Sequence, residues 1–220
     1  MPALLITGTD TGVGKTWVGR ALGHALARAG RRVVAIKPVE MGCAHVSPRK
    51  EDGALLAAAT GQAEPREALY RFDADVAPAV AADAAGTPID LDAMLLRIEA
   101  LADGAEVLLL EGSGGLLTPF TWEWTIVDVA RSVGAAALLV GSDRLGTINL
   151  ALMTLSALEL AGIAVAGMVL TTPEVPDATT GTNAASIGRL AGLDRIVAVP
   201  RLPDPLMAGD AMAPVIGWLE

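Results

Sequence analysis

Cysteine is almost absent from this sequence, because Cys43 is the only one among 220 residues. No disulfide within the chain and no zinc site built from several cysteines is therefore possible. Aromatic residues are also scarce, at 3% of the chain, although hydrophobic residues make up 52%. We expect a sizeable core packed mainly from alanine, leucine and valine, with Cys43 as an inert thiol.

Long apolar runs and positive charge are lacking as well. No run reaches the ~18 residues of a membrane span without an interrupting charge or turn residue. The N-terminus, Met1-Pro2-Ala3-Leu4, has no basic start of the kind that signal peptides carry. The formal net charge is -9, from 16 basic and 25 acidic residues, whereas contacts to nucleic-acid phosphates need clustered Lys and Arg. We expect a cytoplasmic protein that binds neither membrane nor nucleic acid.

Short apolar runs that alternate with helical stretches are abundant. The runs predict strands at residues 4–7, 33–36, 107–110, 136–140, 164–170 and 196–199. Helices are predicted at residues 16–29, 54–59, 79–85, 91–101, 147–160 and 183–190, with Asp90 as an N-cap. This alternation predicts an α/β fold with a mainly parallel sheet and helices on both faces. Without a repeat or a long linker, we expect residues 1–220 to form a single domain.

Ligands of such sheets bind beyond the carboxyl ends of the strands. The residues that close the predicted strands are Gly8, Lys37, Glu111, Gly141 and Thr171. These positions are therefore the first places to look for a site.

The segment Gly8-Thr9-Asp10-Thr11-Gly12-Val13-Gly14-Lys15-Thr16 follows a predicted strand and opens a predicted helix. In a phosphate-binding loop (P-loop), glycines let successive N–H groups converge on anionic oxygens, and the helix start adds its positive dipole. Lys15 would reach the terminal phosphates of a nucleoside triphosphate, and the Thr16 hydroxyl would ligate Mg²⁺. A P-loop NTPase-type domain is thus predicted. The alternative is a glycine-rich turn that binds nothing.

Three more residues are candidates for this site. Glu111 ends a strand and precedes a glycine-rich stretch, so it is either a second protein oxygen for Mg²⁺ or an ordinary strand-end acid. Lys37 is either solvated or placed to neutralise charge on a transferring phosphoryl group. Asp52 is either a further metal ligand or, taken alone, the N-cap of the helix that follows.

The spacing of the loop is unusual, since five residues rather than four separate Gly8 from Gly14. Further motifs are Lys37-Pro38-Val39, Glu111-Gly112-Ser113-Gly114-Gly115, Leu145-Gly146-Thr147-Ile148-Asn149, and Pro200 after the last strand. With these motifs the chain resembles the dethiobiotin synthetase family along nearly its full length, and the five-residue gap is characteristic of that family.

The resemblance implies an ATP- and Mg²⁺-dependent enzyme of biotin biosynthesis, a ligase of the cyclo-ligase class. Its substrates would be 7,8-diaminopelargonate, CO₂ (or bicarbonate) and ATP, and its product dethiobiotin. A carbamate would form on one amine and attack the γ-phosphate to give a carbamic–phosphoric anhydride. The second amine would then close the ring and expel phosphate.

The resemblance also implies roles for individual residues. Lys37, Lys15 and Thr11 would be catalytic, and Thr16, Asp52 and Glu111 would hold Mg²⁺. Nucleotide contacts are implied for Gly12, Val13, Gly14, Lys15, Thr16, Trp17, Asp52, Glu111, Gly112, Ser113, Gly114, Thr171, Thr172, Pro200, Arg201 and Leu202. Substrate contacts are implied for Thr11, Lys37, Met41, Gly146, Thr147, Ile148 and Asn149, the last four reaching the neighbouring subunit of a homodimer.

Three positions depart from the family pattern. Met41 stands where the family more often has Ser or Thr, and Gly12 replaces an acid found in some members. Thr171 occupies the place of an Asn that reads adenine, and losing that amide removes ~1–3 kcal/mol of base discrimination. We therefore predict a weakened preference for ATP over other nucleoside triphosphates.

Other classes of protein remain as alternatives. A partition or positioning ATPase would carry an extra lysine early in the loop, where this chain has Thr9-Asp10-Thr11. The synthetase-like domain of cobyrinate amidases would need an appended glutaminase domain with a cysteine nucleophile. A catalytically dead nucleotide-binding module is the third alternative, favoured by Met41.

Overall fold

The apolar runs of the sequence become the strands of one parallel sheet. In this computed structural model, which describes residues 1–219, the strands pair in the order β2-β5-β1-β6-β7-β8. Each neighbouring pair is parallel. The strands are β1 (Ala3–Gly8), β2 (Val33–Ile36), β5 (Val107–Gly115), β6 (Ala136–Ser142), β7 (Val165–Thr171) and β8 (Ile196–Val199). The prediction of a mainly parallel sheet is confirmed.

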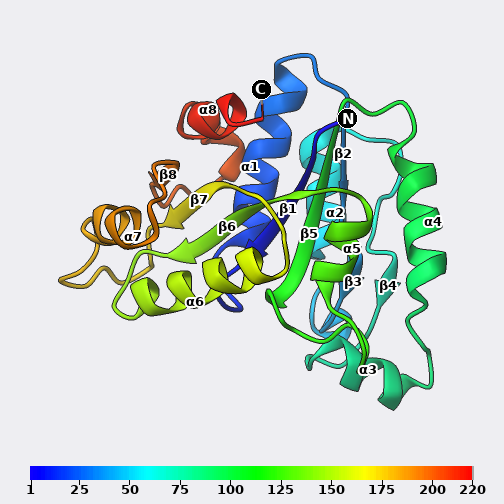
Figure 1. The fold of residues 1–220 in the computed structure, drawn as a ribbon. Coiled ribbons are helices and arrows are strands. Elements are labelled where there is room, and N and C mark those ends of the chain that lie inside the picture. The colour runs from blue at the N-terminus through cyan, green and yellow to red at the C-terminus, as the bar shows by residue number, and fades with distance from the viewer. Residues whose placement is uncertain (220) are drawn as a thin grey trace.

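Helices cover both faces of the sheet, as predicted (Figure 1). They are α1 (Lys15–Arg28), α2 (Asp52–Thr60), α3 (Pro78–Ala85), α4 (Leu91–Ala102), α5 (Ile126–Ser132), α6 (Thr147–Leu160), α7 (Asn183–Ala191) and α8 (Gly209–Gly217). Successive residues of a strand point to opposite faces. Leu4 and Ile6 of β1 accordingly pack in a buried cluster with α1, α2 and α8, whereas Leu5 packs with α4 and α5. Helices α6 and α7 pack against β6 and β7.

The glycine-rich end of one strand, β5, is longer than the sequence predicts. β5 continues past Leu110 through Gly115, so Glu111 lies inside the strand rather than closing it. Glu111 is in register with Ile6 of β1, and Gly115 with Gly8 after an irregularity in the pairing. Pairing with β1 outweighs the weak strand propensity of glycine there. This register places the Glu111 carboxylate beside the P-loop.

A small second sheet was not predicted. β3 (Val39–Glu40) pairs in parallel with β4 (Tyr70–Arg71). Helices α5 and α8 were also missed, although Thr125 and Asp128 form a capping box at the start of α5. Residues 42–50, predicted as a loop, contain the short 3₁₀ helices Cys43–His45 and Pro48–Lys50. Within residues 1–219, no helix has both the length and the apolar character to cross a membrane.

Candidate functional site

The P-loop connects β1 to α1 and curls as a phosphate cradle requires. Gly12 and Gly14 have φ angles of 73° and 95°, in the left-handed region that other residues adopt only with strain. A Cβ on Gly8 would lie 2.8 Å from the Asp10 carbonyl oxygen, so the turn is also tight. No side chain caps the first turn of α1. Its N–H groups are therefore available to an anion.

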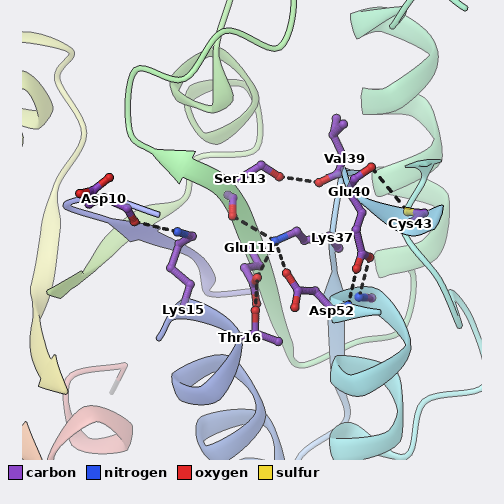
Figure 2. Close-up of polar contacts among 12 residues, drawn as sticks. Asp10, Lys15, Thr16, Lys37, Val39, Glu40, Cys43, Asp52, Glu111 and Ser113 are labelled. Carbon is purple, nitrogen blue, oxygen red and sulfur yellow. Dashed lines mark hydrogen bonds and ion pairs between the residues drawn. The ribbon is translucent and has the colours of Figure 1, made fainter. Parts of the chain in front are cut away.

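Lys15 is buried beneath this loop. Its ammonium donates a hydrogen bond to the Asp10 carbonyl oxygen at 3.0 Å (Figure 2). Burial, and then repulsion from Lys37, lower the pKa of Lys15 to about 8. A negatively charged ligand in the loop would relieve that repulsion and favour the charged ammonium.

Lys37 joins three elements at the carboxyl end of the sheet. Its ammonium donates to Glu111 Oε1 of β5 at 2.6 Å and to Asp52 Oδ2 of α2 at 2.9 Å. The Thr16 hydroxyl donates to the same Glu111 oxygen at 2.8 Å, so α1 is tied in as well (Figure 2). The Gly112 carbonyl is a longer acceptor, 3.4 Å from Lys37.

The charges in this cluster are strongly coupled. Burial alone would lower the pKa of Lys37, but attraction to Glu111 and Asp52 raises it overall. Burial raises the pKa of Asp52, and the attraction of Lys37 outweighs that effect and lowers it. For Glu111 burial is the largest influence and raises the pKa. Attraction to Glu111 and Asp52 therefore favours the charged form of Lys37 and holds its ammonium in place.

The oxygen atoms of this cluster suit a hard divalent cation. Glu111 Oε2 is buried without any hydrogen-bond partner. The Thr16 hydroxyl bonds to the other oxygen of Glu111, and the Asp52 carboxylate bonds to Lys37. Within residues 1–219, no group of three or more His, Cys, Asp or Glu side chains could hold a metal. A hydroxyl, one or two carboxylates and retained water are the ligands that Mg²⁺ usually takes, so the residues fit this ion.

Asp52 does not act as a helix N-cap, so that interpretation from sequence is wrong. Asp52 is the first residue of α2, and no side-chain cap comes from the preceding Glu51. Instead the Glu40 carboxylate, from the unpredicted strand β3, accepts hydrogen bonds from the backbone N–H groups of Asp52 and Gly53. Because Glu40 satisfies these donors, the Asp52 carboxylate is free to pair with Lys37.

Two hollows meet at the P-loop. The lysine hollow has a volume of about 340 Å³ and is lined by Thr11, Gly12, Gly14, Lys15, Thr16, Trp17, Lys37, Glu40, Met41, Asp52, Asp75, Ser113 and Gly114. The β7–β8 hollow, about 400 Å³, is lined by Gly12, Val13, Gly14, Trp17, Ser142, Arg144, Thr171, Thr172, Pro173, Glu174, Val199, Pro200 and Arg201. Together they form a path from the strand-end lysines to the far edge of the sheet, with the loop glycines between.

The residues implied for nucleotide contact are distributed along this path. Thr171 donates its hydroxyl to the carbonyl oxygens of Val13 at 2.8 Å and Gly141 at 3.3 Å. It therefore braces the P-loop. The Thr172 hydroxyl donates to a strand carbonyl at 2.9 Å. Glu111, Gly112 and Leu202 lie outside both linings. The Leu202 carbonyl accepts from the Trp17 indole N–H at 3.3 Å.

The residues implied for substrate contact divide between two places. Thr11, Lys37 and Met41 line the lysine hollow. Gly146, Thr147 and Asn149 line a third one, the α6 hollow, of about 310 Å³ at the start of α6. Ile148 is absent from that lining and packs against the cluster between α6 and β7. Within one chain, the two sets of substrate residues do not share a hollow.

Two acids of the site carry no signal in the sequence, namely Glu40 and Asp75. Glu40 is buried by the pairing of β3 with β4, and Asp75 reaches the lysine hollow from the segment after β4. Neither residue belongs to a motif or ends a predicted strand. Only recognition of the two-residue strands could have found them.

Comparison with known proteins shows the family to which the chain belongs. The family described as an AAA domain matches residues 2–206. The ATP-dependent dethiobiotin synthetase BioD of Anaeromyxobacter dehalogenans (strain 2CP-C) is 40% identical over 98% of this chain and 97% of its own. The protein of the same name from Aquifex aeolicus (strain VF5) is 36% identical over 91% of this chain and 90% of its own.

A solved structure shares the fold at much lower identity. The MinC:MinD cell division protein complex of Aquifex aeolicus contains a chain with a TM-score of 0.60 and 17% identity. The match covers 96% of this chain and 88% of that one. At this identity the likeness shows the P-loop NTPase-like fold alone.

Proposed function

The chain belongs to the family of ATP-dependent dethiobiotin synthetases, and from this membership we propose how its site carries out the reaction. It is an ATP-dependent cyclo-ligase that closes the ring of dethiobiotin in biotin biosynthesis. We infer that the substrates are 7,8-diaminopelargonate, CO₂ or bicarbonate, and ATP, and that the enzyme works in the cytoplasm.

The proposed reaction proceeds in three steps. One substrate amine adds to CO₂ and loses a proton, giving a carbamate. A carbamate oxygen then attacks the γ-phosphorus of ATP, ADP leaves, and a carbamic–phosphoric anhydride forms. The second amine attacks the carbonyl carbon of the anhydride, which closes the five-membered ureido ring as phosphate and a proton leave.

The positions of Lys15 and Lys37 support this sequence of steps. Both ammonium groups line one hollow, where each can stabilise negative charge on the carbamate and on the transferring phosphoryl group. Glu111 and Asp52 hold Lys37 in one orientation, so little reorganisation is needed when charge develops. Thr11 lies in the same lining and would contact substrate.

Thr16, Asp52 and Glu111 would hold the magnesium ion. Bound Mg²⁺ supplies positive charge to the phosphate oxygens and orients them. The support is the Glu111 carboxylate, whose Oε1 accepts from the Thr16 hydroxyl at 2.8 Å and whose buried Oε2 has no hydrogen-bond partner. The base and ribose would then occupy the β7–β8 hollow, against Trp17 and Pro200.

A homodimer would bring the divided substrate residues together. The N-terminal turn of α6 has no side-chain cap, so its N–H groups can receive a carboxylate. In the α6 hollow the hydroxyls of Thr9 and Thr147 are buried without partners. We propose that this hollow receives the carboxylate end of the substrate that reacts in the neighbouring subunit.

The observation that carries this proposal is the convergence of Lys37, Asp52 and Glu111 beside the P-loop. The decisive experiment measures phosphate release from ATP with Mg²⁺, with and without 7,8-diaminopelargonate and bicarbonate. We expect release only when both are present, together with dethiobiotin in equal amount. Phosphate release that does not depend on the diamine would favour the partition or positioning ATPase instead. No phosphate release would favour a catalytically dead nucleotide-binding module.

A further inference from the structure

The lysine hollow contains a carboxylate that no step above uses. Asp75 lines this hollow together with Lys37 and Met41. Within residues 1–219, no hydrogen bond or ion pair occupies its carboxylate, whereas the other acids of the site have partners. Glu40 caps α2, and Asp52 and Glu111 bind Lys37. Among the described residues that line the hollow, Asp75 is thus the acid whose carboxylate has no protein partner and no proposed metal role.

The backbone fixes Asp75 in this position. The Phe72 N–H donates to the Glu40 carbonyl at 2.9 Å, the Gly42 N–H to the Ala74 carbonyl at 3.1 Å, and the Cys43 N–H to the Phe72 carbonyl at 3.0 Å. These bonds extend the β3–β4 pairing and hold the segment before Asp75 against the segment after Lys37. A Cβ built on Gly42 would lie 3.5 Å from the Asp75 carboxyl carbon, so the side chain rests over this glycine.

We propose that Asp75 is a specificity-determining residue that binds an ammonium group of the diamine substrate. The inference rests on the proposed function, because the reactant there is an aliphatic diamine. Aliphatic amines resemble the lysine side chain, whose pKa is ~10.4, and are largely protonated at neutral pH. Lys37 is already paired with Glu111 and Asp52, so the unpaired carboxylate of Asp75 in the same lining can receive such a cation.

The experiment compares Asp75→Asn with the wild-type enzyme in steady-state assays. Charge-assisted hydrogen bonds are the stronger ones, but Asp75 is exposed and solvent screens its charge, so we expect the KM for 7,8-diaminopelargonate to rise about 5- to 20-fold. The KM for ATP should change less than about twofold. Asp75→Glu should recover part of the loss. Added salt should raise the diamine KM of the wild type more than that of Asp75→Asn, because salt screens exposed charges.

Asp73→Asn provides the matched control, since Asp73 is an exposed acid on the same segment that lines a different hollow. It should leave both KM values unchanged. An unchanged diamine KM in Asp75→Asn would overturn the inference while the synthetase function stands. An equal rise in both KM values would also overturn it, because it would indicate general distortion of the site. Absence of diamine-dependent phosphate release in the wild type would remove the proposed function and this inference together.

Discussion

At the scale of single residues, Lys37 decides how the site is organised. Its side chain is 5% exposed, and two carboxylate oxygens lie 2.6 Å and 2.9 Å from its ammonium. A buried charge of this kind persists only when it is paired and hydrogen-bonded. Lys37 therefore holds Glu111 and Asp52 together.

Replacing Lys37 with alanine should lower turnover by about 100-fold or more, because one preorganised charge at the transferring group is lost. Steady-state phosphate release measures this effect. The variant also leaves Glu111 buried without its partner, which destabilises the fold by up to about 3–5 kcal/mol, so the thermal midpoint is recorded alongside.

Two further variants separate chemistry from folding. Lys37→Arg keeps the charge but not its compact shape, and should retain stability better than turnover. Lys50→Ala removes the exposed lysine of the following loop and should change neither quantity. Near-normal turnover in Lys37→Ala would exclude Lys37 from the reaction.

Thr171 bears on the choice of nucleotide. The single proton of its hydroxyl is directed at the Val13 carbonyl oxygen 2.8 Å away, with the Gly141 carbonyl oxygen at 3.3 Å, so it is not available to donate to a base. We expect kcat/KM values for ATP, CTP and GTP to lie within about tenfold of one another, equivalent to ~1.4 kcal/mol. A preference for ATP of several hundredfold would contradict this prediction and would indicate base recognition by the backbone.

At the scale of elements, α2 controls where Asp52 lies. The start of this helix is fixed on one side by hydrogen bonds to Glu40. On the other side, the backbone of Glu67 and Ala68 packs against Gly53. A Cβ built on Gly53 would lie 2.5 Å from the backbone nitrogen of Ala68, a distance that real contacts do not reach. Glycine is therefore required for this close approach.

Gly53→Ala should displace α2 and carry Asp52 away from Lys37. We expect a loss of stability of about 1–3 kcal/mol from overpacking and a weaker affinity for Mg²⁺, measured by thermal denaturation and by the Mg²⁺ dependence of turnover. Gly217→Ala is the control, because a Cβ there meets no atom within 4 Å. Equal stability and equal Mg²⁺ dependence of turnover in the two variants would show that the contact with Ala68 is unimportant.

At the scale of the whole molecule, the outer face of α6 has no covering element within residues 1–219. Met153 and Leu160 are 63% and 90% exposed, although α6 begins at the predicted substrate site. Apolar side chains scattered singly need no explanation, but two on one helix that borders a substrate hollow are consistent with a subunit interface. This face is where we expect the second copy to pack.

Met153→Glu should weaken the dimer, because it buries a charge at the proposed interface. Sedimentation should change from twice the mass of one chain toward a single chain, and the KM for the diamine should rise if the partner supplies the carboxylate contact. Leu96→Glu alters a side chain of similar exposure, 67%, on α4 and should leave both properties unchanged. A monomeric wild-type enzyme with full activity would contradict the dimer proposal.

The sequence by itself determined the elements whose cause is local. The P-loop, the strands from residues 33–36 and 196–199, the helix Thr147–Leu160 and the Asp90 cap all follow from neighbouring residues. Glycine conformation, apolar periodicity and capping act over a few positions, so these features can be seen in one stretch of chain. The strand-end position of Lys37 was visible for the same reason.

Only the tertiary structure decided which side chains meet. Lys37 and Glu111 are 74 positions apart, and their contact depends on the register of β5 against β1 and β2. Glu40, rather than Asp52, caps α2 because two strands of two residues bring it there. Strands that are far apart in the sequence are stabilised by packing in the completed sheet. Their pairing therefore leaves no local pattern in the sequence. Asp75 reaches the lysine hollow by the same means.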